Sequence, residues 1–487
     1  MGSVRPILTP AEMAEADRRT IAAGTPEAVL VDRAGRAVAL RARAMLDGDY
    51  GRRVVIACGK GNNGADGRVA GSVLKARGIG VDTFGVQHVD HDAFVRSLRR
   101  ADLFVDAMFG TGFRGALEND PVWVAQTVAE HGLPVLAVDI PSGVDGATGA
   151  VRDDAVRALA TVTFAARKPG LVFEPGRSHS GRVHVADIGI DLGLPHIVMA
   201  EVADLVLPHR DPLGHKWSAG LLVFGGSIGM LGAPMLVGRA AARCGAAMVV
   251  AALPGADAAA HLSGTEIVTR AVPATDDGFL DEDAARVVLK DIRRYRAVAV
   301  GPGLGRDDRA QAAARRLVAE APIPIVVDAD GLNALAADPS PLRVRHAAGF
   351  PTAVLTPHAG EFERLAGHAV GDDRIADART LAAQTAAIVL LKGPGTVIAT
   401  PDGRAFVNPS GGPALATAGT GDVLTGVIAG LLANGADPVD AAVSGAYVHG
   451  RAADVAGTGD DLVAIDLIEA LHPTLDGLRS RRDPWEE

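Results

Sequence analysis

Short apolar runs that end in glycine-rich loops recur along the chain, and helical patterns follow the loops. The first run, Val54 to Cys58, is typical of a buried strand; the loop G-K-G-N-N-G-A-D-G occupies 59–67, and a helical stretch continues to Arg77. This alternation predicts parallel sheets covered by helices on both faces. Ligands bind such α/β sheets at the carboxyl ends of the strands, so the glycine loops are the candidate sites.

Composition limits the class of protein. A chain of 487 residues is too long for one ordinary core, and 48% hydrophobic with 22% charged residues indicates well-buried globular domains. The formal net charge of -10 argues against nucleic acid as the main partner. The two cysteines, Cys58 and Cys244, favour a reducing compartment over a disulfide framework. Neither a signal-peptide core nor an uncharged apolar run of about 18 residues occurs, so we expect a cytoplasmic protein without a membrane segment.

Three polar loops follow predicted strands in the N-terminal half. After the loop at 59–67, D-A-M-F-G-T-G-F occupies 106–113 and D-I-P-S-G-V-D-G occupies 139–146. Since the carboxyl ends of parallel strands share one edge of a sheet, we expect the three loops to converge. Taken alone, each has a simpler interpretation, because an Asp that closes a strand commonly caps the next turn and the pair Asn62-Asn63 suits a tight turn.

The N-terminal half resembles the NAD(P)HX epimerase domain, whose pattern is G-x-G-N-N-G-G-D-G, V-D-A-x-F-G-T-G and D-I-P-S-G. The resemblance covers roughly residues 10–200 and implies a Rossmann-like three-layer domain. One departure is Ala65, where the family usually has glycine. If this position required a positive φ, alanine would be unfavourable there.

The epimerase resemblance also implies a set of site residues. Those that would bind the hydrated dinucleotide, NADHX or NADPHX, are Asn62, Asn63, Gly64, Ala65, Asp66, Gly110, Thr111, Gly112, Phe113, Arg114, Gly115, Ala116 and Asp139. Those that would hold a potassium ion are Asn63, Asp106 and Ser142, whose amide, carboxylate and hydroxyl oxygens are hard donors. Asp139 is the expected catalytic group, either as a base or as the stabiliser of a cationic ring.

The alternation lapses between about Ile188 and Leu213, where the sequence becomes rich in proline and polar toward its end. We place the domain boundary in this segment. The expected domains are therefore 1–208 and 209–487.

The C-terminal half is organised around a glycine turn that opens a buried helix. The turn A-G-T-G-D at 418–422 precedes apolar residues at helical spacing from Val423 to Leu431. Backbone N–H groups in a first helical turn have no partner within the helix, so the turn suits a phosphate or a developing oxyanion. Asp422 is placed to accept a proton from a hydroxyl that attacks a phosphoryl group, although Asp is also a common N-terminal helix cap.

This turn and seven earlier motifs resemble the ADP/ATP-dependent NAD(P)HX dehydratase domain, a ribokinase-like fold, over roughly residues 209–487. The motifs are H-K, G-G-S, G-A-P, G-P-G-L-G, D-A-D-x-L, T-P-H-x-G-E and K-G-x-x-T, in the family's order. One departure is Trp217, where the family commonly has glycine, and it affects the fit of that loop.

The dehydratase resemblance implies a second set of site residues. Those that would bind the adenine nucleotide are Lys392, Gly393, Pro394, Gly395, Thr396 and Gly421, with Gly419 and Thr420 completing the anion hole. Those that would contact the hydrated cofactor are Ala233, Gly303, Gly305 and His358, and Asp422 would be the catalytic carboxylate. From the residues alone, His358 also suits a structural role beside a turn proline and Lys392 a solvated strand end. Asp328 and Asp330 are expected to be structural or to contact magnesium indirectly.

Together the two halves predict the repair of hydrated nicotinamide cofactors. The first domain would interconvert the R and S hydrates of NADH and NADPH, and the second would dehydrate the S hydrate with Mg²⁺ and ADP or ATP, the resemblance favouring ADP. The partners would be these small molecules, with no nucleic acid and no membrane, and we expect a homo-oligomer. The alternative is a kinase of a small alcohol fused to a non-catalytic dinucleotide-binding module.

Overall fold

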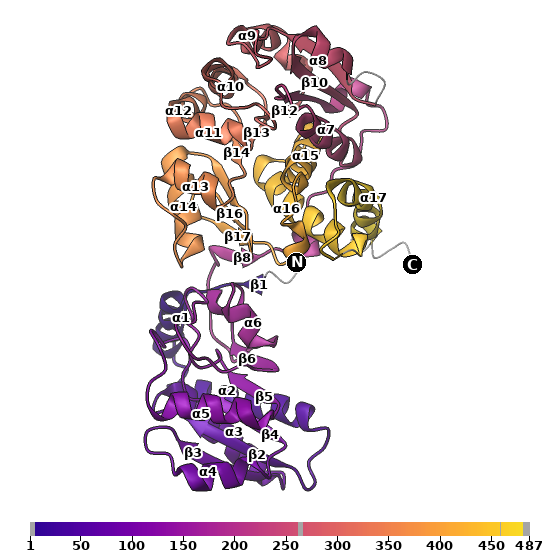
Figure 1. Cartoon of the computed structure of the whole chain (residues 1–487). Coiled ribbons are helices and arrows are strands. Elements are labelled where there is room, and N and C mark those ends of the chain that lie inside the picture. The colour runs from indigo at the N-terminus through magenta and orange to yellow at the C-terminus, as the bar shows by residue number, and fades with distance from the viewer. Residues whose placement is uncertain (1–4, 262–265, 458, 481–487) are drawn as a thin grey trace. The chain divides into compact units, whose positions relative to one another are not determined.

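The computed structural model describes residues 5–261, 266–457 and 459–480. In this range the chain forms two compact units, Arg5–Ile197 and a second unit that starts at Val198 (Figure 1). The division falls before the boundary expected after residue 208, because the Ala200 N–H already bonds to the Val407 carbonyl (3.0 Å) in the sheet of the second unit. The outer ends of the two expected domains, at residues 1 and 487, lie outside the described residues.

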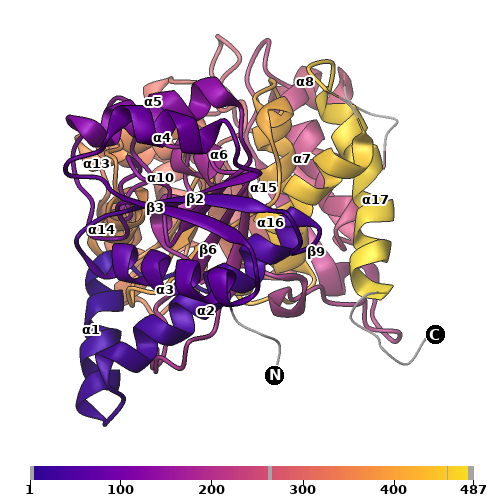
Figure 2. The same ribbon diagram turned by 90° about the horizontal axis from the view of Figure 1, so that it is seen from below.

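The N-terminal unit is built on a parallel sheet with the strand order β3-β2-β4-β5-β6-β7. The strands of this unit are β1 (Arg5–Pro6), β2 (Arg53–Cys58), β3 (Gly80–Gly85), β4 (Leu103–Ala107), β5 (Val135–Val138), β6 (Ala160–Phe164) and β7 (Arg182–Ala186). Its helices are α1 (Pro10–Ala22), α2 (Glu27–Leu46), α3 (Asn62–Ala76), α4 (His91–Leu98), α5 (Asp120–His131), the 3₁₀ turn η1 (Pro169–Leu171) and α6 (Gly176–Ser180). Figure 2 shows α2 and α3 on one side of the sheet and α4 and α5 on the other, which confirms the predicted three-layer Rossmann-like fold.

Helices cover both faces of this sheet, and its central strands are apolar for that reason. Along β2, Val54 and Ile56 pack into the core under α2 and α3, while Val55 and Ala57 pack into the core under α4 and α5. All of β4 is buried, including Asp106. A carboxylate in such a position requires hydrogen bonds, and those of Asp106 belong to the site described below.

The C-terminal unit has a larger sheet with the strand order β8-β17-β16-β15-β14-β13-β12-β9-β10-β11. These strands are β8 (Ile197–Met199), β9 (Gly220–Phe224), β10 (Met248–Pro254), β11 (Val268–Val272), β12 (Ala297–Val300), β13 (Ile325–Val327), β14 (Val354–Leu355), β15 (Ile388–Leu391), β16 (Val397–Ala399) and β17 (Ala405–Val407). The pairs from β11 to β15 are parallel, whereas β16 runs antiparallel to β15 and β17. The unit is ribokinase-like, as predicted.

Helices surround this second sheet. They are α7 (Gly232–Arg243), α8 (Gly255–His261), α9 (Asp283–Leu289), α10 (Asp308–Glu320), α11 (Asp330–Ala337), α12 (Ser340–Ala347), α13 (Ala359–Ala366), α14 (Arg374–Thr385), α15 (Thr420–Ala433), α16 (Pro438–Ala456) and α17 (Ala464–Ser480). Single 3₁₀ turns occur at η2 (Val202–Asp204), η3 (Lys216–Ala219), η4 (Ile292–Arg294) and η5 (Pro413–Leu415). Among the described residues, no helix is both long and apolar enough to cross a bilayer.

Helix α15 is the buried element that the glycine turn predicted. Every residue from Val423 to Ala433 is buried, and the helix packs against α7 and α16. Its contact with α7 depends on glycine: a Cβ at Gly426 would lie 2.3 Å from the Val237 carbonyl oxygen, far inside van der Waals contact. The backbones of the two helices therefore approach closely, as small residues at a helix crossing allow.

The start of α15 differs from the sequence expectation. The helix begins at Thr420 after the N-cap Gly419, which has a φ of 87°. Asp422 is consequently the third helical residue and not the cap, so the capping interpretation of this side chain is wrong. Glycine replaces a capping side chain because a left-handed backbone turn precedes the helix.

Helix α17 is longer than the sequence predicts. The helical pattern after Ala464 and the proline at 473 predict an end near His472, but the helix continues through Pro473 to Ser480 because its apolar face stays buried as far as Leu478.

The two departures from the family patterns, Ala65 and Trp217, are both accommodated. Ala65 lies inside α3 and does not have a positive φ, so alanine is tolerated there. Trp217 in η3 lies under the Arg294 guanidinium, 3.7 Å from the ring centroid, which gives the large ring a packing role.

Candidate functional sites

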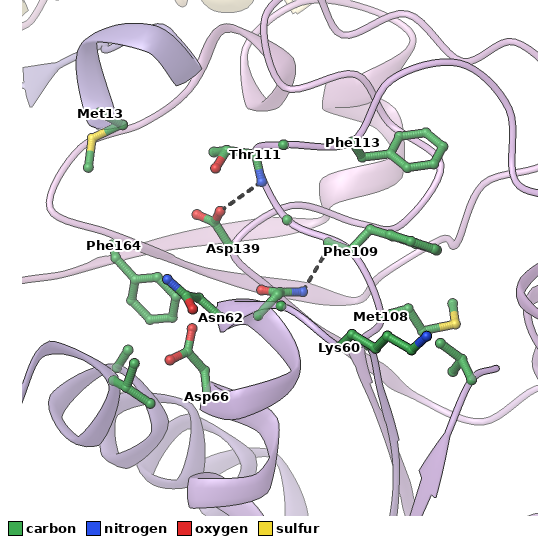
Figure 3. Close-up of a pocket in the computed structure, with 18 of the residues that line it drawn as sticks. Met13, Lys60, Asn62, Asp66, Met108, Phe109, Thr111, Phe113, Asp139 and Phe164 are labelled. Carbon is green, nitrogen blue, oxygen red and sulfur yellow. Dashed lines mark hydrogen bonds between the residues drawn. The ribbon is translucent and has the colours of Figure 1, made fainter. Parts of the chain in front are cut away.

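A cavity of about 960 Å³ lies in the N-terminal unit at the carboxyl ends of its strands. The three polar loops meet there, as expected (Figure 3). The predicted residues that line it are Asn62, Asn63, Asp66, Gly110, Thr111, Gly112, Phe113 and Asp139. The predicted residues that are not part of the lining are Gly64, Ala65, Arg114, Gly115 and Ala116. Met13 and Ile190 add apolar surface from outside the three loops.

Asp139 occupies a strained position directly after β5. Its φ is 66°, a left-handed value that few non-glycine residues adopt and that is concentrated at functional sites. Its Oδ1 accepts hydrogen bonds from Lys168 Nζ (2.7 Å) and Thr163 Oγ1 (3.0 Å), and Oδ2 accepts one from the Thr111 N–H (3.1 Å). Lys168 is only 2% exposed. Asp139 and Lys168 therefore form a buried carboxylate–ammonium pair at the cavity wall.

Asp106, Ser142 and Asn63 form a second network behind the same loops. Asp106 accepts hydrogen bonds from Ser142 Oγ (2.6 Å), from the Ser142 N–H (2.7 Å) and from the Met108 N–H (3.2 Å). Burial raises the pKa of Asp106 to about 6, against the lowering effect of these bonds. Asn63 donates to the Phe109 carbonyl (2.8 Å), while its Oδ1 is buried without a partner in the described part of the chain.

Asp66 of α3 and Asp17 of α1 also face the cavity. Only 6% of Asp66 is exposed, and its carboxyl group makes no hydrogen bond or ion pair with any described residue. Burial raises the pKa of Asp66 to about 8, and the negative charge of Asp139 adds to the effect. Burial also raises the pKa of Asp17. The cavity thus contains carboxyl groups in very different surroundings.

In the C-terminal unit, Asp422 lies half-buried in the first turn of α15. Burial raises the pKa of Asp422 to about 7; the nearby Asp328 acts in the same direction and Lys392 opposes it. A carboxyl group with such a pKa is suited to exchange protons near neutral pH.

Asp328 directly follows β13 and forms hydrogen bonds to residues after β15 and within α15. Its Oδ1 accepts a hydrogen bond from Lys392 Nζ (2.9 Å), and its Oδ2 accepts one from Thr425 Oγ1 of α15 (2.7 Å). Burial acts to raise the pKa of Asp328, but Lys392 and Thr425 hold it below the usual range. The structure therefore places Lys392 in an ion pair beside Asp422 and not on a solvated strand end.

The first turn of α15 presents free backbone donors. The N–H groups of Gly421 and Asp422 have no acceptor among the described residues. A Cβ at Gly421 would lie 3.7 Å from Lys392 Nζ, so these donors adjoin the ammonium group. The Thr420 hydroxyl donates a hydrogen bond to the Leu415 carbonyl (2.7 Å), so it does not point a donor out of the turn. The turn is thus a small positive pocket suited to an oxyanion.

His358 and the glycine loops complete the predicted set. His358 is the N-cap of α13, and its Nδ1 accepts from the Gly360 N–H (3.0 Å), so the neutral ring carries its proton on Nε2. Burial lowers the pKa of His358. A Cβ at Gly303 would lie 3.3 Å from Ala233 Cβ, and the Gly305 N–H bonds to Asp330 Oδ2 (3.0 Å). The predicted nucleotide loop, Gly393, Pro394, Gly395 and Thr396, forms the turn between β15 and β16.

Comparison with known proteins relates both units to one family. A family model described as NAD(P)H-hydrate dehydratase matches residues 221–472, and one described as YjeF-related protein N-terminus matches residues 27–92 and 85–170. The bifunctional NAD(P)H-hydrate repair enzyme Nnr of Moorella thermoacetica is 39% identical to the chain, and the match covers 92% of each protein. The chain belongs to the family of bifunctional NAD(P)H-hydrate repair enzymes. The Salinibacter ruber member is 37% identical over 96% of the chain and 95% of its own length.

A solved structure also resembles the dehydratase half of this repair-enzyme chain. It is the ADP/ATP-dependent NAD(P)H-hydrate dehydratase from Bacillus subtilis, crystallised with ATP and Mg²⁺. The two are 30% identical with a TM-score of 0.46, and the match covers 57% of the chain and 96% of that structure.

Both sites of this NAD(P)H-hydrate repair enzyme contain residues that the sequence interpretation missed. Lys168 is one of six lysines in the chain. Its position after a predicted strand and directly before Pro-Gly is the only feature of the sequence that indicates a role for it. Thr425 and His449 gave no local signal. His449 of α16 bonds through Nε2 to the Thr420 carbonyl (2.9 Å) and supports the turn that carries Asp422.

Proposed function

We propose that the N-terminal unit interconverts the R and S hydrates of NADH and NADPH, and that the C-terminal unit dehydrates the S hydrate in a reaction coupled to ADP or ATP. The observation that carries the proposal is the surroundings of Asp422. A carboxyl group with a pKa of about 7 lies in a helix turn with free N–H groups, close to the Lys392 ammonium. A base, an oxyanion pocket and a cation are the parts that phosphoryl transfer to a hydroxyl needs.

The dehydration then follows from these groups. The hydroxyl oxygen of the hydrate attacks the terminal phosphorus of the nucleotide while Asp422 accepts the hydroxyl proton. The bond from that phosphorus to the bridging oxygen breaks, and the N–H groups of Gly421 and Asp422 offset the charge on the transferring group. The phosphorylated hydroxyl next leaves as inorganic phosphate, an adjacent ring carbon loses a proton, and the dihydropyridine is restored.

We propose ADP or ATP with Mg²⁺ as the phosphoryl donor, with the turn between β15 and β16 holding the nucleotide. In the part of the chain that the structure describes, no group of three or more His, Cys, Asp or Glu side chains is arranged to hold a metal ion. Mg²⁺ usually keeps several waters and is bound by one or two carboxylates together with substrate phosphates. Asp328 and Asp330 are the nearby carboxylates that fit this role.

In the epimerase cavity, Asp139 is the proposed stabiliser of a cationic ring. Both of its oxygens already accept hydrogen bonds, and the Lys168 ammonium is paired with Oδ1. These bonds fix the position of the carboxylate, and its negative charge favours a positive ring nearby.

We further propose a potassium ion at Asn63, Asp106 and Ser142. The support is the buried Oδ1 of Asn63, an oxygen with no partner among the described residues. Asn63 and Ser142 both hydrogen-bond to Phe109, and Ser142 donates to the fully buried Asp106 carboxylate. A cation near these oxygens would satisfy both, and it would supply positive charge that helps to position the dinucleotide phosphates.

Removal of potassium is expected to lower the stability of the N-terminal unit. A ligand present at ten times its Kd stabilises the folded state by about 1.4 kcal/mol. Replacing potassium by choline at constant ionic strength should therefore lower the midpoint of thermal unfolding and slow epimer exchange. Asn63→Leu should unfold at the same temperature in both salts. Equal midpoints for the unmodified protein in potassium and choline would contradict the site.

The proposed function is tested on the full chain with an epimeric mixture of hydrated NADH. Absorbance of the dihydronicotinamide ring is followed after addition of ADP or ATP in parallel. Full recovery is expected, and the faster nucleotide identifies the donor. Recovery that stops near half would mean a dehydratase without an epimerase. No recovery, together with a stable phosphorylated product from a small alcohol, would favour the kinase interpretation.

Cytoplasmic residence and assembly into a homo-oligomer are also proposed. Cys58 and Cys244 are both free and buried, and burial raises their thiol pKa values to about 11 and about 12, which favours unreactive thiols in a reducing compartment. Light scattering of the purified chain tests the oligomer, and a monomeric mass at micromolar concentration would contradict it.

A further inference from the structure

Two of the carboxyl groups that line the epimerase cavity have surroundings that differ in one decisive respect. Asp139 accepts three hydrogen bonds and is paired with Lys168. Asp66 lines the same cavity and is buried, with only 6% of its surface exposed. It has no hydrogen-bond or ion-pair partner in the described part of the chain. Figure 3 shows the Asp66 side chain rising from α3 toward the part of the cavity where Asp139 lies. A buried carboxyl group without partners is much more stable when protonated.

The charges around Asp66 favour the protonated form as well. The charged groups that face it are Arg68 of α3, Asp17 of α1, Glu27 of α2, Asp139 after β5 and Lys168 after β6. The Lys168 ammonium is occupied by Asp139, and the Arg68 guanidinium donates to the Gly59 carbonyl (3.1 Å). Burial, then Asp139 and Asp17, raise the pKa of Asp66 to about 8, and Arg68 opposes them. At neutral pH Asp66 is therefore a neutral acid, in the same cavity as the Lys168–Asp139 ion pair.

We propose that Asp66 is the general acid of epimerisation and acts opposite the anion Asp139. This inference rests on the proposed function and deepens it. The Asp66 carboxyl gives its proton to the hydroxyl oxygen of the hydrate, the bond between that oxygen and the ring carbon breaks, and water leaves. The lone pair of the neighbouring ring nitrogen forms a carbon–nitrogen double bond, which makes the ring cationic beside Asp139. Water then adds to the opposite face and releases a proton to solvent, and the Asp66 carboxylate regains a proton from solvent.

The division of roles follows from the geometry. A leaving hydroxide needs a proton donor, and a carboxylate that is ion-paired with Lys168 has no proton to give. The cationic ring needs a nearby negative charge, and a neutral carboxyl group does not provide one. Each group suits one task, and two carboxyl groups whose environments separate their protonation states are a common basis for acid catalysis at neutral pH.

Asp66→Asn tests the inference in the full chain. The variant keeps the size of the side chain and has no acidic proton, so the rate of R-to-S exchange should fall by about 10²-fold or more, corrected for spontaneous exchange. Dehydration of the pure S hydrate in the same protein should stay unchanged, which shows that the C-terminal unit is folded and active, and an unchanged midpoint of thermal unfolding shows that the N-terminal unit is folded. Asp92→Asn, at an exposed position of α4, is the matched control and should exchange at the normal rate.

Three further measurements test the inference. Exchange by the unmodified protein should fall as pH rises through about 8, because the protonated form of Asp66 is required, and this fall should be absent in Asp66→Asn. In ¹⁸O-labelled water, each exchange should introduce one labelled oxygen at the hydroxyl position. Asp66→Glu, which keeps the acid, should recover part of the rate.

Three outcomes would overturn the inference. They are exchange by Asp66→Asn within threefold of the normal rate, an alkaline fall that persists in this variant, and exchange without uptake of ¹⁸O. Absence of exchange in the unmodified protein is a different result, because it would remove the epimerase function itself and this inference with it.

Discussion

Replacement of Asp422 by asparagine is expected to reduce the rate of nucleotide-dependent dehydration by about 10²–10⁴-fold, the usual contribution of a general base. The amide has nearly the same size but does not accept the hydroxyl proton. Initial rates at saturating hydrate and nucleotide measure the effect. R-to-S exchange by the N-terminal unit of the same protein provides an internal measure of folding.

The pH dependence gives an independent check on Asp422. Its pKa is about 7, mainly because of burial, and the ionised form is the base. The kcat/KM of dehydration should therefore fall as pH drops below about 7, whereas a structural carboxyl group would leave this limb unaffected. Asp476→Asn, at an exposed position of α17, should behave like the unmodified protein. Dehydration by Asp422→Asn at more than a third of the normal rate would exclude Asp422 as the base.

Replacement of Lys168 by methionine is expected to lower the free energy of unfolding of the N-terminal unit by about 3–5 kcal/mol, as removal of one partner of a buried ion pair does. The Asp139 carboxylate would remain buried without its counter-ion, which sits 2.7 Å away in the intact pair. Urea unfolding measures the change, and epimer exchange should be lost with it.

A double variant distinguishes the lost pair from lost packing. Lys168→Met combined with Asp139→Asn should recover more than half of the lost stability, because no charge is then left buried alone. It should not recover epimer exchange. Lys75→Met, at an exposed position of α3, is the control and should change stability by less than about 0.5 kcal/mol. If the double variant were no more stable than Lys168→Met, the pairing argument would fail.

The fold was largely predictable because its signal is local. Apolar runs that end in glycine loops identify parallel strands, and the convergence of three polar loops in the N-terminal unit follows from the topology of such a sheet. The end of α17 was not predictable in this way, because Pro473 is a local stop signal that burial of Leu475 and Leu478 overrides. The N-cap of α15 is Gly419, three residues before Asp422, and a glycine cap leaves no capping side chain to recognise.

The sites were predictable only as far as sequence motifs reach. Asp139 stood out as the end of a strand, but its pairing with Lys168 joins two separate strand ends and requires an unusual φ at Asp139. Asp328 was expected to be structural or to contact magnesium indirectly, and its bond to Thr425 of α15 depends on tertiary packing. Which carboxyl group is paired and which is isolated depends on tertiary structure, so sequence motifs do not reveal it.

The close contact between α7 and α15 joins two parts of the proposed dehydratase site. Helix α7 starts at Gly232, beside the residues proposed to contact the hydrate, and α15 starts at the turn proposed to hold the terminal phosphate. Where the helices cross, Gly426 leaves room only for backbone. The separation of the two helices at this point is thus set by backbone contact. A single methyl group at Gly426 would lie 2.3 Å from the Val237 carbonyl oxygen, so we expect Gly426→Ala to push the helices apart and to slow dehydration from inside the core.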